Sequence, residues 1–211
     1  SILDLNSGQI TQLTEGLDRS IDSVDWAGSS SQLLISFDDF GQRKIASVDM
    51  EGNLRPLVSD AGSAGISRPY TSGSVSVAGN GAYAYTAGGP QRPADVALGH
   101  DDTAIRLTDL NADLLDHKTL GEVREISWRS SVGDHDIYGW LVTPPGFDEA
   151  QEYPLLLEIH GGPFTAYVPH FSTEVQLYAA AGYVVLYTTP RGSTSYGYEF
   201  ATELHPNEPS Q

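Results

Sequence analysis

The chain has 211 residues, of which 28 are acidic and 11 basic, so its formal net charge is −17. Such acidity argues against nucleic-acid binding, which needs a basic surface, and against binding to an anionic membrane. No stretch reaches the roughly 20 apolar residues of a membrane-spanning helix. Cysteine is absent, which excludes disulfides and a thiol nucleophile and fits a reducing compartment, so we expect a cytoplasmic location.

Short strands separated by turn residues fill the chain up to about residue 120. The first residue is Ser1, not methionine, so we expect the numbering to begin inside a larger protein. Strands are predicted at residues 10–13, 24–26, 33–37, 44–50 and 54–58. The passage 87–103 is rich in Gly, Pro and Asp and is predicted to be an elaborated loop between strands.

An imperfect repeat runs through these strands. Leu3-Asp4-Leu5-Asn6-Ser7-Gly8 resembles Val48-Asp49-Met50-Glu51-Gly52, and Leu107-Thr108-Asp109-Leu110-Asn111 echoes both. A spacing of about 45 to 60 residues is in the range of four-stranded propeller blades. The repeat therefore favours a partial β-propeller over a β-sandwich.

From residue 122 the pattern becomes that of a mixed sheet. Residues 123–128 and 136–142 are predicted to form an antiparallel pair. The nearly continuous apolar run at 153–160 is typical of a strand buried on both faces. A further strand is predicted at 183–188, with a helix and no hairpin before it, which indicates a parallel crossover. We place a domain boundary near residue 120.

The predicted helix follows from apolar spacing. Phe171, Val175, Tyr178 and Gly182 recur at helical intervals and define one face. Thr173 and Gln176 have the spacing of a capping box, and Gly182 suits the residue that ends a helix.

The apolar run at 153–160 stops abruptly at His160-Gly161-Gly162-Pro163. Gly161 and Gly162 allow backbone angles closed to other residues and leave room for a ligand against the main chain. Pro163 fixes the exit direction and has no N–H. In α/β-hydrolases a loop of this kind after the third strand supplies one oxyanion-hole N–H. This loop is the candidate site.

Three motifs in chain order carry a family resemblance. They are Gly-Trp-Leu-Val-Thr-Pro-Pro-Gly-Phe at 139–147, His-Gly-Gly-Pro at 160–163 and Thr-Pro-Arg-Gly-Ser-Thr-Ser-Tyr-Gly-Tyr-Glu-Phe at 189–200. Together they resemble the start of the catalytic domain of the prolyl oligopeptidase family of serine peptidases, closest to its acylaminoacyl-peptidase branch. The resemblance implies a mixed fold, with partial β-propeller blades at 1–120 and the N-terminal part of an α/β-hydrolase domain at 121–211.

The resemblance also implies roles for individual residues. Gly162 sits where the family places an oxyanion-hole N–H, while His160, Gly161 and Pro163 shape the loop, and His160 is not expected to act as a base. Arg191 either supports neighbouring loops or contacts substrate. No metal or organic cofactor is implied.

The sequence contains no G-x-S-x-G elbow, and Gly192-Ser193-Thr194-Ser195-Tyr196-Gly197 is a near miss with the wrong spacing. The Ser, Asp and His of a catalytic triad are therefore expected beyond Gln211, and the chain is predicted to be inactive alone. The expected parent is a serine peptidase that hydrolyses short peptides, such as acylaminoacyl peptides or oligopeptides. The alternatives are a non-catalytic interaction protein and a carboxylesterase, and a homo-oligomer is compatible with the sequence.

Metal ligation is a weaker interpretation of the remaining polar residues. Asp134-His135-Asp136 is predicted to be a turn, because three adjacent residues converge poorly on one ion. No second partner stands at ligand spacing from the histidines His100, His117, His170 and His205.

Overall fold

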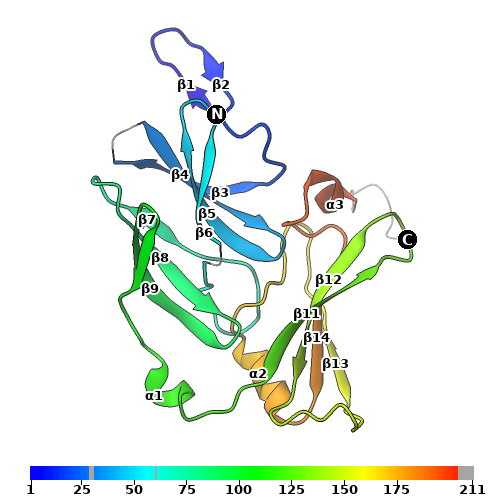
Figure 1. Cartoon of the computed structure of the whole chain (residues 1–211). Coiled ribbons are helices and arrows are strands. Elements are labelled where there is room, and N and C mark those ends of the chain that lie inside the picture. Colours follow the sequence, from blue (N-terminus) through cyan, green and yellow to red (C-terminus); the bar gives the residue numbers. More distant parts are fainter. Residues whose placement is uncertain (29–30, 60, 204–211) are drawn as a thin grey trace.

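The computed structural model describes residues 1–28, 31–59 and 61–203, which form three four-stranded sheets and a small hairpin (Figure 1). Two of the sheets are antiparallel meanders. The first comprises β3 (Ile21–Ala27), β4 (Gln32–Asp39), β5 (Gln42–Asp49) and β6 (Leu54–Val58), and the second β7 (Val75–Val77), β8 (Tyr83–Gly89), β9 (Arg92–His100) and β10 (Thr103–Arg106). The hairpin of β1 (Ile2–Leu3) and β2 (Ile10–Thr11) precedes them. Successive four-stranded meanders confirm the predicted partial propeller.

The repeated Asp-to-Gly segments form similar turns. Asp4 accepts a hydrogen bond from the Asn6 N–H at 2.8 Å, and Asp49 accepts one from the Asn53 N–H at 2.8 Å. Gly8 (φ 71°) and Gly52 (φ 86°) both adopt the left-handed conformation that favours glycine. The sequence echo therefore reflects a shared turn chemistry at the ends of two hairpins.

The predicted loop at 87–103 is wrong, because most of it is the nine-residue strand β9. The Gly and Pro residues lie where a sheet tolerates them. Pro93 stands near the hairpin end of β9, beyond the residues 97–100 that pair with β10, so its missing N–H breaks no bond to that strand. Gly99 lies under the Tyr83 ring, which a Cβ at this position would overlap, so a larger residue would force the ring to move.

The third sheet is mixed. Its strands are β11 (Glu122–Arg129), β12 (Asp136–Thr143), β14 (Val184–Thr189) and β13 (Leu155–Glu158), in that spatial order. The first three pair antiparallel, and β13 lies parallel to β14. The helices are α1 (Ala112–Leu115), α2 (Thr173–Ala180) and α3 (Tyr198–Thr202), and α2 connects β13 to β14. This topology confirms the predicted strand–helix–strand unit.

Helix α2 begins one residue earlier than the capping-box spacing predicts. Ser172, not Thr173, is the N-cap, and its Oγ accepts from the Val175 N–H at 3.2 Å. Gln176 does not return to the cap. Its side chain instead accepts from the Gly121 N–H at 2.8 Å and donates to the Gly121 carbonyl at 3.2 Å. At the other end Gly182 (φ 93°) ends the helix as predicted.

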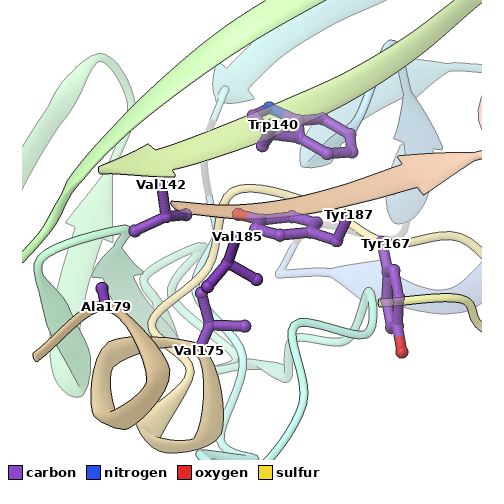
Figure 2. Close-up of a cluster of buried hydrophobic side chains, with 7 residues drawn as sticks. All are labelled: Trp140, Val142, Tyr167, Val175, Ala179, Val185 and Tyr187. Atoms are coloured by element: carbon purple, nitrogen blue, oxygen red, sulfur yellow. The ribbon is translucent and has the colours of Figure 1, made fainter. Parts of the chain in front are cut away.

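The core of this part lies between the mixed sheet and α2. Figure 2 shows its buried members, which are Trp140, Val142, Tyr167, Val175, Ala179, Val185 and Tyr187. Trp140 and Tyr187 stack with ring centroids 5.4 Å apart. Burying the side chains of such residues is the main favourable term in folding, at about 25 cal/mol per Å² of apolar surface.

Strand β13 is not buried on both faces as predicted. Leu156 packs against the core, but Leu155 is 60% and Leu157 50% exposed. Within the described residues β13 is one of the two edge strands, and α2 packs against one face of the sheet. The run is apolar as predicted, but nothing in the described structure covers the second face of this strand.

The first meander contacts the loop that follows β14 through the tip of the β4–β5 hairpin. The Phe40 N–H donates to the Ser195 carbonyl at 3.0 Å, and the Gly41 N–H donates to Ser195 Oγ at 2.7 Å. The Phe40 ring meets the edge or face of Tyr138 and Tyr196. The tip can approach this closely because Gly41, at φ 69°, carries no Cβ.

Replacing Gly41 with alanine is expected to destabilise the protein by about 2–5 kcal/mol, since a left-handed φ costs about 1–2 kcal/mol and overpacking about 1–3 kcal/mol. The new Cβ would lie 2.6 Å from Cζ2 of the buried Trp140. Urea-induced unfolding measures the effect. Gly16→Ala is the matched control, because nothing lies within 4 Å of its Cβ position. Equal stability of the two variants would contradict this account of the hairpin tip.

Candidate active site

The candidate loop follows the carboxyl end of β13, where the chain leaves the sheet. We call residues 159–165 the His160 loop and residues 190–197, which follow β14, the Arg191 loop. Two backbone hydrogen bonds join them: the Phe164 N–H donates to the Gly192 carbonyl at 3.0 Å, and the Thr194 N–H donates to the Thr165 carbonyl at 3.1 Å. Because β13 and β14 are parallel neighbours, their following loops meet at one edge of the sheet.

The buried His160 side chain holds the loop together. Its Nδ1 lies 2.7 Å from the Gly161 carbonyl oxygen, and its Nε2 lies 3.2 Å from Ser193 Oγ. Since a carbonyl oxygen only accepts, Nδ1 carries the proton in this contact. The ring also packs edge-on against Tyr167, with centroids 4.8 Å apart. These contacts support the prediction that His160 shapes the loop.

Gly161 and Gly162 could adopt backbone angles closed to other residues, but neither has a positive φ in the structure. A Cβ on Gly161 would meet nothing within 4 Å, and one on Gly162 would meet only the Phe164 nitrogen at 4.0 Å. The fold itself therefore does not require glycine at either position. What the glycines provide is bare, exposed main chain.

The Gly162 N–H has no hydrogen-bond acceptor within residues 1–28, 31–59 and 61–203. Its orientation is set by its neighbour, because the Gly161 carbonyl and the Gly162 N–H share one planar peptide unit and point in opposite directions. Holding the Gly161 oxygen on His160 Nδ1 therefore fixes the direction of the Gly162 N–H. The Gly162–Pro163 bond that follows is cis.

A cavity of about 190 Å³ separates the two loops. His160, Gly162 and Pro163 line one side, and residues 190–193 line the other. The structure thus brings the predicted site residues Gly162 and Arg191 to one cavity, although 29 positions separate them in sequence. A larger cavity of about 460 Å³ lies at the junction with the first meander, lined by Asp18, Asp22 and Asp38 and by the exposed Phe164.

Arg191 is held by an acidic partner. Its Nε lies 3.5 Å from Glu203, and the other oxygen of Glu203 lies 2.8 Å from Nε2 of His135. The cluster ties the β11–β12 hairpin and the end of α3 to the Arg191 loop. Whether Arg191 supports these loops or contacts substrate stays a prediction. No sequence pattern pointed to Glu203 or to Ser193, since their partners are distant in the chain.

The other polar candidates are engaged in local contacts. Arg129, the last residue of β11, pairs with Asp134 in the hairpin connection and with Asp136 at the start of β12. His100 lies 3.1 Å from Asp101, and His117 is exposed, whereas His205 is outside the described residues. In the part of the chain that the structure describes, no three His, Asp or Glu side chains gather as a metal site, and no helix is long and apolar enough to cross a membrane.

The sequence of this chain is similar to a peptidase family model and to known peptidases. The model of the prolyl oligopeptidase family matches residues 169–209. The probable dipeptidyl-peptidase 5 of Emericella nidulans is 30% identical over 224 aligned positions, covering 98% of this chain and 29% of that protein. The uncharacterized peptidase YuxL of Bacillus subtilis is 28% identical over 220 positions, covering 96% of this chain and 32% of the relative. The chain thus spans less than a third of these relatives.

Solved structures show the same architecture. Acylaminoacyl peptidase of Pyrococcus horikoshii superposes with a TM-score of 0.76 at 21% identity, covering 93% of this chain and 29% of that one. Dipeptidyl peptidase 4 of Porphyromonas gingivalis gives 0.74 at 18% identity, covering 95% and 29%. The fold is that of a propeller–hydrolase protein, part propeller and part α/β-hydrolase sheet. The resemblance to the prolyl oligopeptidase family is confirmed.

The buried His170, just before α2, is expected to make stability pH-dependent. Burial lowers its pKa from 6.5 to about 4, and Arg43 acts in the same direction. The unfolded chain then binds the proton more readily, so stability is lost as pH falls from about 6.5 to 4, by on the order of 3 kcal/mol.

Urea unfolding across this pH range tests the expectation with His170→Gln, which should flatten the profile in that window. His117→Gln, at an exposed position, is the control and should leave it unchanged. A wild-type profile that does not fall below pH 6.5, or one that His170→Gln does not alter, would show that His170 is not the responsible group.

Proposed function

We propose that this chain is part of a serine peptidase that hydrolyses short peptides, and that the Gly162 N–H is one of its oxyanion-hole donors. The observation that carries the proposal is an exposed amide with no acceptor among the described residues, held in a fixed direction beside a cavity. An unsatisfied, preoriented donor costs no reorganisation when charge develops on a nearby oxygen.

The chemistry follows from the resemblance and the position of the amide. A serine hydroxyl attacks the peptide carbonyl, its proton passes to a histidine, and the carbonyl oxygen becomes an anion. The Gly162 N–H would donate to that oxygen. Collapse of the intermediate restores the carbonyl as a serine ester and expels the amine, which takes the proton from the histidine. Water, deprotonated by the same histidine, then attacks the ester, which releases the acid and returns the proton to the serine. Removing one such donor typically costs about 10²–10³ in kcat.

The nucleophile, its histidine and its aspartate are proposed to lie in additional sequence of a longer polypeptide. The chain has no G-x-S-x-G, and its relatives are more than three times as long as the part it covers. We accordingly propose the division into propeller blades at 1–120 and the start of the hydrolase domain at 121–211. Cytoplasmic location and homo-oligomerisation stay predictions.

Two substrate classes follow from the names of similar proteins. Some are dipeptidyl-peptidases, and one solved relative is an acylaminoacyl peptidase in complex with Z-Gly-Gly-Phe-chloromethyl ketone. We propose blocked short peptides as the first class to test, because the motifs at 139–200 resemble the acylaminoacyl-peptidase branch. Peptides with a free N-terminal dipeptide are the second.

The 211-residue chain alone is expected to show no turnover of either substrate class, because it lacks a nucleophile. The complete polypeptide should release the chromophore from an acetyl-amino-acid anilide and lose that activity after treatment with a serine-directed phosphonate. Turnover by the 211-residue chain would refute the proposed division of the site. A complete polypeptide with an intact triad and no turnover of any peptide would refute the function and favour the interaction protein.

Gly162→Ala in the complete polypeptide is expected to lower kcat/KM by about 10–100-fold, since a methyl group beside the amide displaces the reacting carbonyl. The melting temperature should not fall, because the Cβ has open space and an ordinary φ. Chromogenic assays and thermal unfolding measure the two effects. Gly16→Ala, equally unhindered and remote, serves as control. Unchanged kinetics for Gly162→Ala would remove Gly162 from the site.

A further inference from the structure

The His160 loop is bordered by a segment from the other half of the chain. Residues 66–72, between β6 and β7, run antiparallel to residues 165–174. Backbone hydrogen bonds link Thr71 N–H to the Ala166 carbonyl at 2.9 Å, Val168 N–H to the Pro69 carbonyl at 2.9 Å and Thr173 N–H to the Ile66 carbonyl at 2.7 Å. Tyr70 and Tyr167 face each other across this pairing as an isolated β-bridge.

Tyr70 connects this segment to His160. Its ring lies 4.8 Å from that of Tyr167 and 6.2 Å from that of His160, and Tyr167 in turn meets His160 edge-on at 4.8 Å. Tyr167 is fully buried, and burial raises the pKa of its hydroxyl, so the ring stays neutral. Aromatic pairs at such separations contribute about 0.5–1.5 kcal/mol beyond the area they bury, and they restrict ring orientation.

An ion pair fixes the start of the same segment. Arg68 lies 3.2 Å from Glu158, the last residue of β13, and 3.2 Å from Glu174 on α2. Arg68 therefore ties the start of the segment both to the strand before the His160 loop and to the helix after it. Tyr70 cannot shift relative to residues 165–174 without breaking the backbone hydrogen bonds on either side of it.

We propose that Tyr70 is a positioning residue for the Gly162 N–H, an inference that rests on the proposed function of that amide. Tyr70 and Tyr167 set the His160 ring. His160 Nδ1 holds the Gly161 carbonyl, and that carbonyl shares its peptide plane with the Gly162 N–H. A residue of the proposed propeller part thus sets the direction of a hydrogen-bond donor in the proposed hydrolase part, so both parts contribute to the site.

Kinetics of the complete polypeptide form the first test. Tyr70→Leu keeps apolar volume and removes the ring, and it is expected to lower kcat by about 10–100-fold with little change in KM, since a displaced donor affects the transition state. Tyr70→Phe keeps the ring and should restore kcat. The control is Tyr178→Leu, because Tyr178 packs on the same core but bonds Glu174 through its hydroxyl, whereas the ring contacts of His160 are with Tyr70 and Tyr167. Equal loss of kcat in Tyr70→Leu and Tyr178→Leu would overturn the proposal.

Amide hydrogen exchange in the 211-residue chain forms the second test and needs no activity. The Phe164 and Thr194 amides report the junction of the two loops. Both should exchange at least about tenfold faster in Tyr70→Leu than in Tyr70→Phe or Tyr178→Leu, because local opening becomes easier. Unchanged exchange in Tyr70→Leu would overturn the positioning role. An inactive wild-type polypeptide would instead refute the proposed function, and the exchange result would still decide whether Tyr70 positions the loop.

Discussion

The antiparallel pairing of residues 66–72 with residues 165–174 is the contact on which the rest of the candidate site depends. It is a backbone ladder between segments about 100 positions apart, and it includes the start of α2 as well as the residues after the His160 loop. Because its hydrogen bonds are main-chain to main-chain, they fix position more tightly than side-chain contacts between the two parts alone would. Helix α2 and the residues after the His160 loop are therefore tied to the segment that joins the two meanders.

The charge distribution supports the same junction. The chain has only 11 basic side chains; Arg68 pairs with carboxylates across this contact, and two further arginines pair with carboxylates of the adjoining first meander. Arg19 pairs with Asp39 at 2.7 Å, Arg43 with Asp38 at 2.8 Å, and Arg68 with Glu158 at 3.2 Å. In a protein with a net charge of −17, placing these few cations beside carboxylates reduces the repulsion between carboxylates that lie close together.

Much of the fold could be predicted because its signals are local. The turn around Asp49 and Gly52, the strand at 54–58 and the helix stop at Gly182 each depend on a few adjacent residues. The predictions fail where the local amino-acid composition conflicts with the pairing of the strands. A Gly- and Pro-rich passage became β9 because its Pro93 falls beyond the paired part of the neighbouring strand, and no composition rule contains that register.

The candidate loop could be located from the sequence, but the contacts that hold it in place could not. The abrupt change from an apolar run to His160-Gly161-Gly162-Pro163 marks the end of a strand. That His160 meets Ser193, and that Tyr70 reaches it from the first half, depends on contacts that no spacing encodes.

The expected reason for the glycines was also incomplete. Gly41 and Gly99 are required by neighbouring rings, which would collide with any Cβ. At Gly161 and Gly162 the space is open and the backbone is ordinary, so the fold supplies no reason for glycine. A glycine pair that the protein does not need for its own packing favours our proposal that a substrate approaches the main chain here, with its oxygen bound by the Gly162 N–H, which has no acceptor among the described residues.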